Sequence, residues 1–223
     1  MKKQDYNLKV ILLAAGKSER FNGIKLLAKV QQKETSITLI EHVFHQISLA
    51  LMELNIDEKN IQIATGRYHS QITTFFSEHE NENSQYIFDY CEDAHLGLGH
   101  TISQSVERII NSAHANENSP SHILIALADQ VALTADNYVA LIKQSLALPN
   151  KLVCAKAKQE LMPPAIFPET YFADLLHLKG NKGAKPILYA NKENLQTVSI
   201  QHAEKDIDTQ QDLANWHNNT QIL

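Results

Sequence analysis

The sequence predicts an α/β fold: one domain built as a mostly parallel sheet with helices on both faces. Residues 10–15 form a continuous apolar run, which is typical of a strand buried on both of its faces. Segments with strand character then alternate with segments of helical apolar spacing, an order typical of βαβ units with right-handed crossovers. The 223 residues suit one α/β domain and contain no internal repeat and no linker, so we expect a single domain over residues 1–223.

The expected elements follow one another from the amino terminus. After the strand at 10–15 comes a polar loop with glycine at 16–25, and a polar surface stretch is expected at 78–85. Further strands are expected, in order, at 61–64, 86–90, 123–128, 152–155 and 195–200. Helices are expected at 37–54, at about 68–76, at 97–110 and at 138–146, with a last one from Thr209 onward.

For two of these elements the side chains explain the predicted structure directly. In the helix over 37–54, apolar residues recur every three or four positions and so share one face; they are Ile40, Val43, Phe44, Ile47, Leu51 and Leu54. The proline-rich stretch 162–168 is expected to be an edge strand or a loop, because proline cannot donate to a sheet ladder. Ligands of open α/β sheets bind beyond the carboxyl ends of the strands, so the loop after residue 15 and Asp129 are candidate site positions.

Composition and charge limit the classes of function. The formal net charge is −5, which argues against a general nucleic-acid binder, since that would need a basic field to hold phosphates. A local basic site for one small polyphosphate is compatible with this charge. Cys91 and Cys154 stand alone, so neither a zinc site nor a disulfide framework is suggested. No stretch is long enough to span a membrane, and we expect a reduced, cytoplasmic protein.

Two short motifs look like nucleotide-binding signatures but fail on spacing. The Gly-Lys-Ser at 16–18 looks like the end of a P-loop, yet Ile11 stands where that motif needs glycine. The Gly-Leu-Gly at 97–99 looks like the start of a dinucleotide fingerprint, yet its third glycine position holds Ile102. Both interpretations are therefore rejected.

The loop over residues 13–25 combines small residues, a hydroxyl and three cations. Alanine and glycine let a backbone approach a ligand closely, and successive N–H groups in such a turn can form an anion-binding nest. Arg20 offers a planar fork for phosphate oxygens and Lys25 a compact charge. The loop thus predicts a triphosphate site, and the alternative is a solvated basic loop after a strand.

Five segments in the same order resemble the nucleotidyltransferases that are similar to the molybdenum cofactor cytidylyltransferase, and the resemblance runs over nearly the whole chain. They are Leu-Ala-Ala-Gly-x-Ser-x-Arg at 13–20 with Lys25 five residues later, Gly-Leu-Gly-His-Thr-Ile at 97–102, Ala-Leu-Ala-Asp-Gln at 126–130, Gly-Asn-Lys-Gly-Ala-Lys at 180–185, and Asp-Ile-Asp-Thr at 206–209 with Asp-Leu at 212–213. The resemblance implies a Rossmann-like nucleotidyltransferase fold. It also implies an enzyme that moves a nucleotidyl group from a nucleoside triphosphate to a phosphorylated acceptor.

The same resemblance implies the site residues. Arg20 and Lys25 are the expected catalytic residues. The residues expected to bind the nucleotide are Leu13, Ala14, Ala15, Gly16, Ser18, Arg20, Lys25, Thr65, Gly66, Gly97, Gly99 and Thr101. His95 and His100 flank the turn at 97–99 and could touch the acceptor.

Mg²⁺ is the expected cofactor, because it is usually held by one or two carboxylates together with substrate oxygens. Asp129, at the end of a buried strand, suits this role, and the resemblance implies Asp208 as the second carboxylate. Asp206 would point to the opposite face if its segment is extended. For both Asp129 and Asp208 the alternative is an ordinary helix cap.

The tetrapeptide at 13–16 bears on the substrates. In the resembled family Leu-Ala-Ala-Gly accompanies cytidylyl transfer and Leu-Ala-Gly-Gly guanylyl transfer, so we expect CTP, with Ala14 filling space that a purine needs. Molybdopterin is the implied acceptor. The chain departs from the family's pattern at Asn22, Val131, Met162 and Lys185. Asn22 replaces a usual glycine, although Asn tolerates a left-handed backbone well.

Two alternatives to this function stay open. One is nucleotidyl transfer to another acceptor, such as a sugar phosphate or methylerythritol phosphate. The other is a non-catalytic factor that binds the molybdenum cofactor and delivers it to a molybdenum hydroxylase. No nucleic-acid partner and no membrane partner are expected.

Overall fold

The computed structural model describes residues 6–32, 35–79, 86–116 and 119–220. Its centre is a seven-stranded sheet in the order β5-β4-β1-β6-β8-β7-β9, in which every strand runs parallel to the others except β8. The strands of this sheet are β1 (Leu8–Ala14), β4 (Ile61–Thr65), β5 (Ile87–Tyr90), β6 (His122–Leu127), β7 (Leu152–Ala157), β8 (Glu160–Pro168) and β9 (Leu195–Ser199). The predicted mostly parallel sheet is confirmed.

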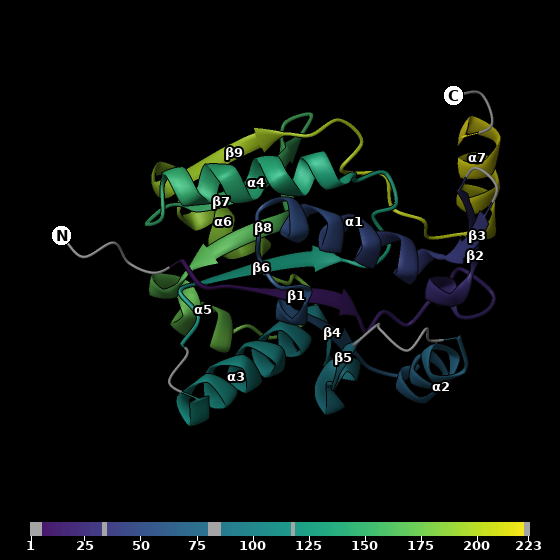
Figure 1. Cartoon of the computed structure of the whole chain (residues 1–223), viewed down its shortest axis with the longest axis horizontal. Coiled ribbons are helices and arrows are strands. Elements are labelled where there is room, and N and C mark those ends of the chain that lie inside the picture. Colours follow the sequence, from purple (N-terminus) through teal and green to yellow (C-terminus); the bar gives the residue numbers. More distant parts are fainter. Residues whose placement is uncertain (1–5, 33–34, 80–85, 117–118, 221–223) are drawn as a thin grey trace.

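Helices cover both faces of the sheet (Figure 1). On one face lie α1 (Leu39–Glu53) and α4 (Ala135–Ala147), and on the other lie α3 (Leu98–Asn116) and α5 (Phe172–Leu176). The remaining helices are α2 (His69–His79), α6 (Lys185–Ala190) and α7 (Gln210–Thr220). Strand β1 contributes alternate side chains to two separate apolar cores, with Val10 and Leu12 in one and Ile11 and Leu13 in the other. This burial on both faces explains its continuous apolar run.

The first helix begins two residues later than its apolar pattern predicts. Thr38 is its N-cap and forms a capping box with Glu41: the Thr38 N–H donates to the Glu41 carboxylate over 2.7 Å, and the Glu41 N–H donates to the Thr38 hydroxyl. Residues before it belong to a two-stranded antiparallel sheet of β2 (Lys29–Gln32) and β3 (Thr35–Thr38). This hairpin, α5 and α6 were missed by the sequence patterns, because each is shorter than the window in which periodicity is read.

The proline-rich strand β8 corrects an expectation. Residues 162–168 were expected at an edge or in a loop, but β8 lies inside the sheet between β6 and β7. Met162 pairs with Ala155, whereas Ala165 pairs with Cys154, so Pro163 and Pro164 fall in the irregularity between the two pairs. A proline in a bulge needs no ladder N–H, and this explains how the strand is accommodated.

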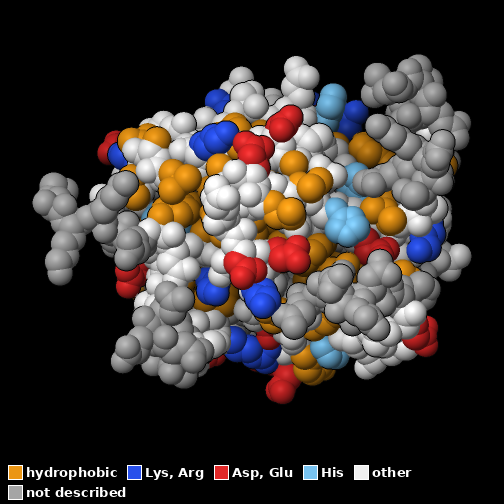
Figure 2. Space-filling view, in the orientation of Figure 1, with side chains coloured by type: hydrophobic (Ala, Val, Ile, Leu, Met, Phe, Trp, Pro, Cys, Tyr) orange, Lys and Arg blue, Asp and Glu red, His pale blue; other side chains and the backbone are white. Residues whose placement is uncertain are grey.

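Other expected elements lie close to their predicted places, with α3 extending to Asn116. Most of the polar stretch 78–85 lies outside the described residues. On the face seen in Figure 2, acidic and basic side chains are intermixed and do not gather into one basic area. Within the described ranges, no helix has the length and apolar character needed to cross a bilayer.

Candidate functional site

Two backbone hydrogen bonds join distant loops at the carboxyl edge of the sheet. The N–H of Ala128 donates to the carbonyl of Leu13 over 3.0 Å, which extends the pairing of β1 and β6. The N–H of Ile207 donates to the carbonyl of Asp129 over 3.2 Å and holds the segment between β9 and α7 against the loop after β6. Asp129 and Asp208, far apart in the sequence, therefore lie in one place.

Lys25 lies between these two carboxylates. Its Nζ is 2.8 Å from Oδ2 of Asp129 and 2.9 Å from Oδ1 of Asp208. Only 10% of the Lys25 side chain is exposed, so these are charge-assisted hydrogen bonds in a poorly hydrated place. Arg20 donates to the other oxygen of Asp208 over 2.6 Å, with 70% of its own side chain exposed. The structure thus brings together the four charged residues predicted for the site.

The charges at this centre shift the titration of two groups. Burial acts to lower the pKa of Lys25, but the carboxylates of Asp129 and Asp208 outweigh it and leave that pKa raised. Loss of hydration, followed by the charges of Asp129 and Asp208, raises the pKa of Asp206 to about 7. The expectation that Asp206 would point to the opposite face is wrong, because residues two apart in an extended segment lie on the same face. Asp206 instead adds a third carboxyl group near the pair.

Neither acid of the pair caps a helix. Thr134 is the N-cap of α4, which leaves Asp129 outside that helix start. At the start of α7, the Thr209 N–H donates to Asp212 over 2.8 Å and the Asp212 N–H donates back to the Thr209 hydroxyl over 3.1 Å. Asp212 also accepts the N–H of Asp208 over 3.1 Å. The capping groups of α7 therefore hold the backbone of Asp208 and leave its carboxylate to the cations.

The loop after β1 is folded by two left-handed residues. Ser18 has φ 52° and Asn22 has φ 53°, as the tolerance of Asn for this conformation predicted. The Phe21 N–H donates to the Ser18 carbonyl over 3.1 Å, and the Lys25 N–H donates to the Ser18 hydroxyl over 3.3 Å. A side chain added at Gly16 would meet no atom within 4 Å, because that space belongs to the open cavity.

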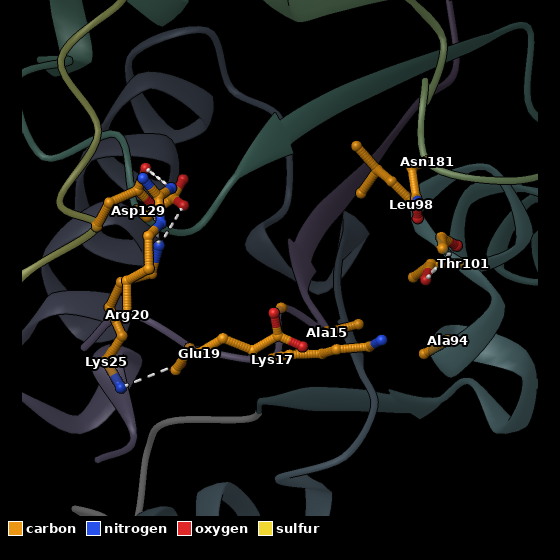
Figure 3. A pocket seen from close by; sticks show the side chains of 14 residues that line it. Ala15, Lys17, Glu19, Arg20, Lys25, Ala94, Leu98, Thr101, Asp129 and Asn181 are labelled. Carbon is orange, nitrogen blue, oxygen red and sulfur yellow. Dashed lines mark hydrogen bonds and ion pairs between the residues drawn. The ribbon is translucent and has the colours of Figure 1, made fainter. Parts of the chain in front are cut away.

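A cavity of about 440 Å³ lies beside this loop. Figure 3 shows Asp129, Arg20 and Lys25 on one side of it and Leu98, Thr101 and Asn181 on the other. Its lining residues are Ala15, Gly16, Lys17, Ser18, Glu19, Arg20, Lys25, Ala94, Gly97, Leu98, Thr101, Asp129, Asn181 and Asp208. Its size falls within the range of about 300–1,000 Å³ usual for small-molecule sites. Cavities of this shape, with charged groups on one wall, can hold a polyphosphate.

A second hollow, of about 400 Å³, adjoins the first. The two share Ala15, Lys17, Glu19 and Ala94 as lining residues. Gly66, one of the predicted residues, lines only this second hollow, together with Arg67 and Glu92. The sequence analysis missed Arg67, Glu92 and Asn181, although Asn181 lies in a segment that matched a family motif.

Four predicted nucleotide-binding residues line neither hollow. The Thr65 hydroxyl is buried and bonded to His69 and to the Asp89 carbonyl. Leu13 faces an apolar core, and Gly99 packs against the backbone of Lys179. Ala14 is only 3% exposed and packs in the other core.

The space-filling role expected of Ala14 needs correction. Successive side chains of a strand alternate between its faces, so Ala14 points into the core while Ala15 points into the cavity. Ala15 is also the position at which Leu-Ala-Ala-Gly and Leu-Ala-Gly-Gly differ. Any effect of this tetrapeptide on the choice of base therefore belongs to Ala15.

The acidic pair has the chemistry of a divalent-cation site. Carboxylate oxygens are the ligands that Mg²⁺ prefers, and the pair already holds a cation, the ammonium of Lys25. Oδ1 of Asp129 is buried and has no hydrogen-bond partner among the described residues. No group of three or more His, Cys, Asp or Glu in the described ranges forms a metal cluster. The residues present thus fit a metal held by two carboxylates and completed by substrate oxygens.

Comparison of the sequence with known proteins gives two matches of interest. Residues 10–196 match the family described as MobA-like NTP transferase domain. The chain is also 26% identical over 179 residues to the purine catabolism protein PucB of Bacillus subtilis (strain 168). That match covers 80% of this chain and 78% of PucB.

Solved structures share the fold. Rv0371c from Mycobacterium tuberculosis H37Rv, in complex with manganese, aligns with TM-score 0.69 and 16% identity, covering 95% of this chain and 98% of that one. CMP:2-keto-3-deoxy-manno-octonic acid synthetase complexed with CTP aligns with TM-score 0.64 and 12% identity, covering 97% of this chain and 100% of that one. At these identities the likeness concerns the fold alone.

Proposed function

The chain belongs to the MobA-like NTP transferase family and is a nucleotidyltransferase of that type, and on this premise we propose that it transfers a cytidylyl group from CTP to molybdopterin. The observation that carries the proposal is the ammonium of Lys25 shared by Asp129 and Asp208 at the wall of an open cavity. Here the lysine and the arginine can bind a triphosphate while the two carboxylates bind a divalent cation.

Arg20 and Lys25 hold the phosphates in this proposal. Because Arg20 is mostly exposed, its ion pair with Asp208 contributes about 1 kcal/mol or less, so the guanidinium can turn to a phosphate with little loss. Lys25 is anchored by its two carboxylates and presents a fixed positive charge. Gly16 leaves open the space into which a phosphate of the substrate would fit.

Asp129 and Asp208 are the proposed ligands of Mg²⁺. When bound, the metal would neutralise charge on phosphate oxygens of the two substrates. The manganese complex of Rv0371c, a protein of the same fold, supports a metal-dependent site. Asp212 and Ile207 are positioning residues. The Asp212 carboxylate accepts the Asp208 N–H and the Ile207 N–H donates to the Asp129 carbonyl, which together keep Asp208 beside Asp129.

The chemical step needs no general base. A phosphate oxygen of the acceptor, already ionised at neutral pH, forms the new bond to the α-phosphorus of CTP. The bond from that phosphorus to the bridging oxygen breaks, and pyrophosphate leaves with the electron pair. What the chain supplies is the alignment of the two substrates and the positive charge of Arg20 and Lys25 around the leaving group.

The second hollow is the proposed site of the base. Arg67 and Glu92 line it, and their side chains can meet different edges of a base. An arginine fork can donate to the adjacent O2 and N3 acceptors of cytosine, whereas a carboxylate can accept from N1 and N2 of guanine. Ala15 lines both hollows, and its methyl group takes space that the glycine of Leu-Ala-Gly-Gly would leave open, which favours the smaller base. The CTP complex of a synthetase with the same fold supports this choice.

An apolar hollow supports molybdopterin over a sugar phosphate as the acceptor. It has a volume of about 160 Å³ and shares Leu98 with the main cavity. Leu127, Pro163 and Phe167 are among the side chains that line it. Lys182 and Lys185 also line it, but most of its lining side chains are apolar. A flat ring system can pack its faces there at lower cost than a sugar, which would lose water from several hydroxyls.

The proposed catalytic domain spans residues 1–223 rather than the matched 10–196 alone. Asp208 and the helix that positions it lie beyond the matched region. The proposed setting is the reducing cytoplasm, which agrees with Cys91 and Cys154 being buried free thiols.

A pyrophosphate-release assay tests the proposal. The chain with Mg²⁺, CTP and molybdopterin should release pyrophosphate and form the cytosine dinucleotide, with GTP a poor substitute in direct competition. Faster turnover with GTP would overturn the choice of base. Turnover with a sugar phosphate or methylerythritol phosphate in place of molybdopterin would overturn the acceptor. Binding of molybdopterin without pyrophosphate release would instead favour a delivery factor for a molybdenum hydroxylase.

A further inference from the structure

The segment at residues 179–183 is joined to the first turn of α3 by two hydrogen bonds. The N–H of Gly99 donates to the carbonyl of Gly180 over 2.7 Å. In return, the N–H of Gly180 donates to Nδ1 of His100 over 3.1 Å. Two motifs that lie about 80 residues apart in the sequence thus bind each other.

Glycines make this approach possible. A Cβ at Gly97 would lie 2.3 Å from Oδ1 of Asn181, and one at Gly99 would lie 2.7 Å from the carbonyl oxygen of Lys179. Gly97 also has φ 120°, which other residues rarely adopt. The glycines at the start of α3 therefore admit a neighbouring chain segment.

The side chain of His100 accepts a hydrogen bond from the backbone of Gly180. Because the donor is a backbone N–H, Nδ1 must be the accepting nitrogen, and the proton of the neutral ring is on Nε2. The ring is half-buried, and His100 is the third residue of α3, in the turn that lines the cavity. The ring thus holds the residue directly before Asn181.

Asn181 presents an uncharged carboxamide to the main cavity. It lies on the side opposite Asp129 and Lys25 (Figure 3). Its side chain makes no hydrogen bond within the described part of the chain, although its oxygen rests over Gly97. A carboxamide can donate to an oxyanion and accept from a hydroxyl or ring N–H. It is free to do both for a ligand.

We propose that Asn181 binds the acceptor substrate through its carboxamide and that His100 is the positioning residue that holds Asn181 there. This inference rests on the proposed function, in which the wall of Arg20, Lys25 and the two aspartates takes the triphosphate. The opposite wall is then left for the second substrate. Thr101 and Leu98 complete that wall, and Leu98 continues into the apolar hollow.

Replacement of His100 separates positioning from a general loss of structure. In His100→Ala the KM for molybdopterin should rise about tenfold, the effect of one lost hydrogen bond, while the Kd of Mg²⁺–CTP stays within about twofold. His100→Asn should restore the KM, because the Asn Oδ1 can accept in the place of Nδ1. His177→Ala is the matched control, since His177 is an exposed histidine bonded only within its own helix turn among the described residues.

Replacement of Asn181 tests the contact itself. Asn181→Ala should raise the KM for molybdopterin about tenfold, with an unchanged melting temperature, because the side chain is exposed and unbonded. An unchanged KM in both His100→Ala and Asn181→Ala would overturn this inference while leaving the transfer reaction in place. Equal weakening of Mg²⁺–CTP binding would also overturn it. A parent chain that releases no pyrophosphate would instead overturn the proposed function, and this inference with it.

Discussion

The backbone N–H of Ile207 donates to the carbonyl of Asp129 across 3.2 Å, although 78 positions separate the two residues along the chain. This bond is what carries Asp208 to the acidic centre, because it fixes the adjacent backbone beside the loop that follows β6. The two carboxylates then share the ammonium of Lys25. The predictions below follow from this arrangement and from the contacts around it.

Loss of one carboxylate should weaken the binding of Mg²⁺. Asp208→Asn keeps the size of the side chain but removes its charge, so turnover should fall on the order of 10²-fold and the Mg²⁺ concentration for half-maximal rate should rise. A titration of initial rate against Mg²⁺ measures both. A variant with the parent's metal dependence would remove Asp208 from the proposed metal site.

Arg20 should matter for turnover and not for stability. In Arg20→Ala, kcat should fall about 10²–10³-fold, because a positive charge near the leaving phosphates is lost. The exposed ion pair with Asp208 contributes about 1 kcal/mol or less to unfolding, so the melting temperature should hardly change. Steady-state kinetics and thermal unfolding on the same sample check this. Near-normal turnover would contradict the assignment.

Arg67 and Glu92 should affect the choice of base in opposite directions. Arg67→Ala should lower kcat/KM for CTP by about tenfold or more, since Arg67 is proposed to donate to O2 and N3 of cytosine. The effect on GTP should be smaller, because guanine presents its adjacent acceptors, O6 and N7, on a different edge of the base. Glu92→Ala should leave CTP use unaltered. Competition between CTP and GTP in one reaction gives the ratio. A larger effect of Glu92→Ala on CTP would reverse the proposed roles.

Asp212 should contribute to both stability and the site. Its carboxylate accepts from Thr209 and from the Asp208 N–H, and the hydrogen bond from the Thr209 side chain is the main cause that lowers the pKa of Asp212. Asp212→Ala should cost about 1 kcal/mol, or roughly 2–4 °C in Tm, while Asp212→Asn should cost less because it keeps an acceptor oxygen. The difference in stability between Asp212→Ala and the parent should shrink as the pH falls through the lowered pKa, where Asp212 loses its charge. Equal melting curves for Asp212→Ala and the parent at pH 7 would count against this capping role.

The buried histidine His122 should make stability fall in mild acid. Burial lowers its pKa below the ordinary 6.5, with a smaller opposing effect from its hydrogen bond to the Pro149 carbonyl. Below pH 6.5 the unfolded chain therefore binds a proton that the native protein does not. The stabilising contribution is complete above pH 6.5 and is lost as the pH falls toward the native pKa, with a slope of at most about 1.4 kcal/mol per pH unit.

Denaturant unfolding at pH 7.5 and pH 5.5 measures this loss for His122. His122→Gln should flatten the dependence on pH, whereas the same change at the exposed His177 should not. A parent protein equally stable at both pH values would argue that His122 is protonated in the native state.

Much of the architecture could be predicted because its signals are local. The apolar run of β1, the spacing of α1 and the acid at the end of β6 each depend on residues within one element, and burial imposes those patterns directly. The family motifs also indicated a nucleotidyltransferase, and the match over residues 10–196 confirms that class. Asn22 likewise adopts the left-handed backbone that its side chain tolerates.

Other features depend on which distant segments of the chain contact each other, and local sequence patterns do not predict such contacts. Pro163 and Pro164 could be placed inside the sheet only once the pairing of β8 with β7 was known. Gly97 and Gly99 were expected to bind the nucleotide, and only the structure shows that residues 179–183 approach both of them closely. The same holds for Ala14 and Ala15. The sequence motif points to both residues, and only the alternation of side chains across a buried strand decides that Ala15 faces the cavity.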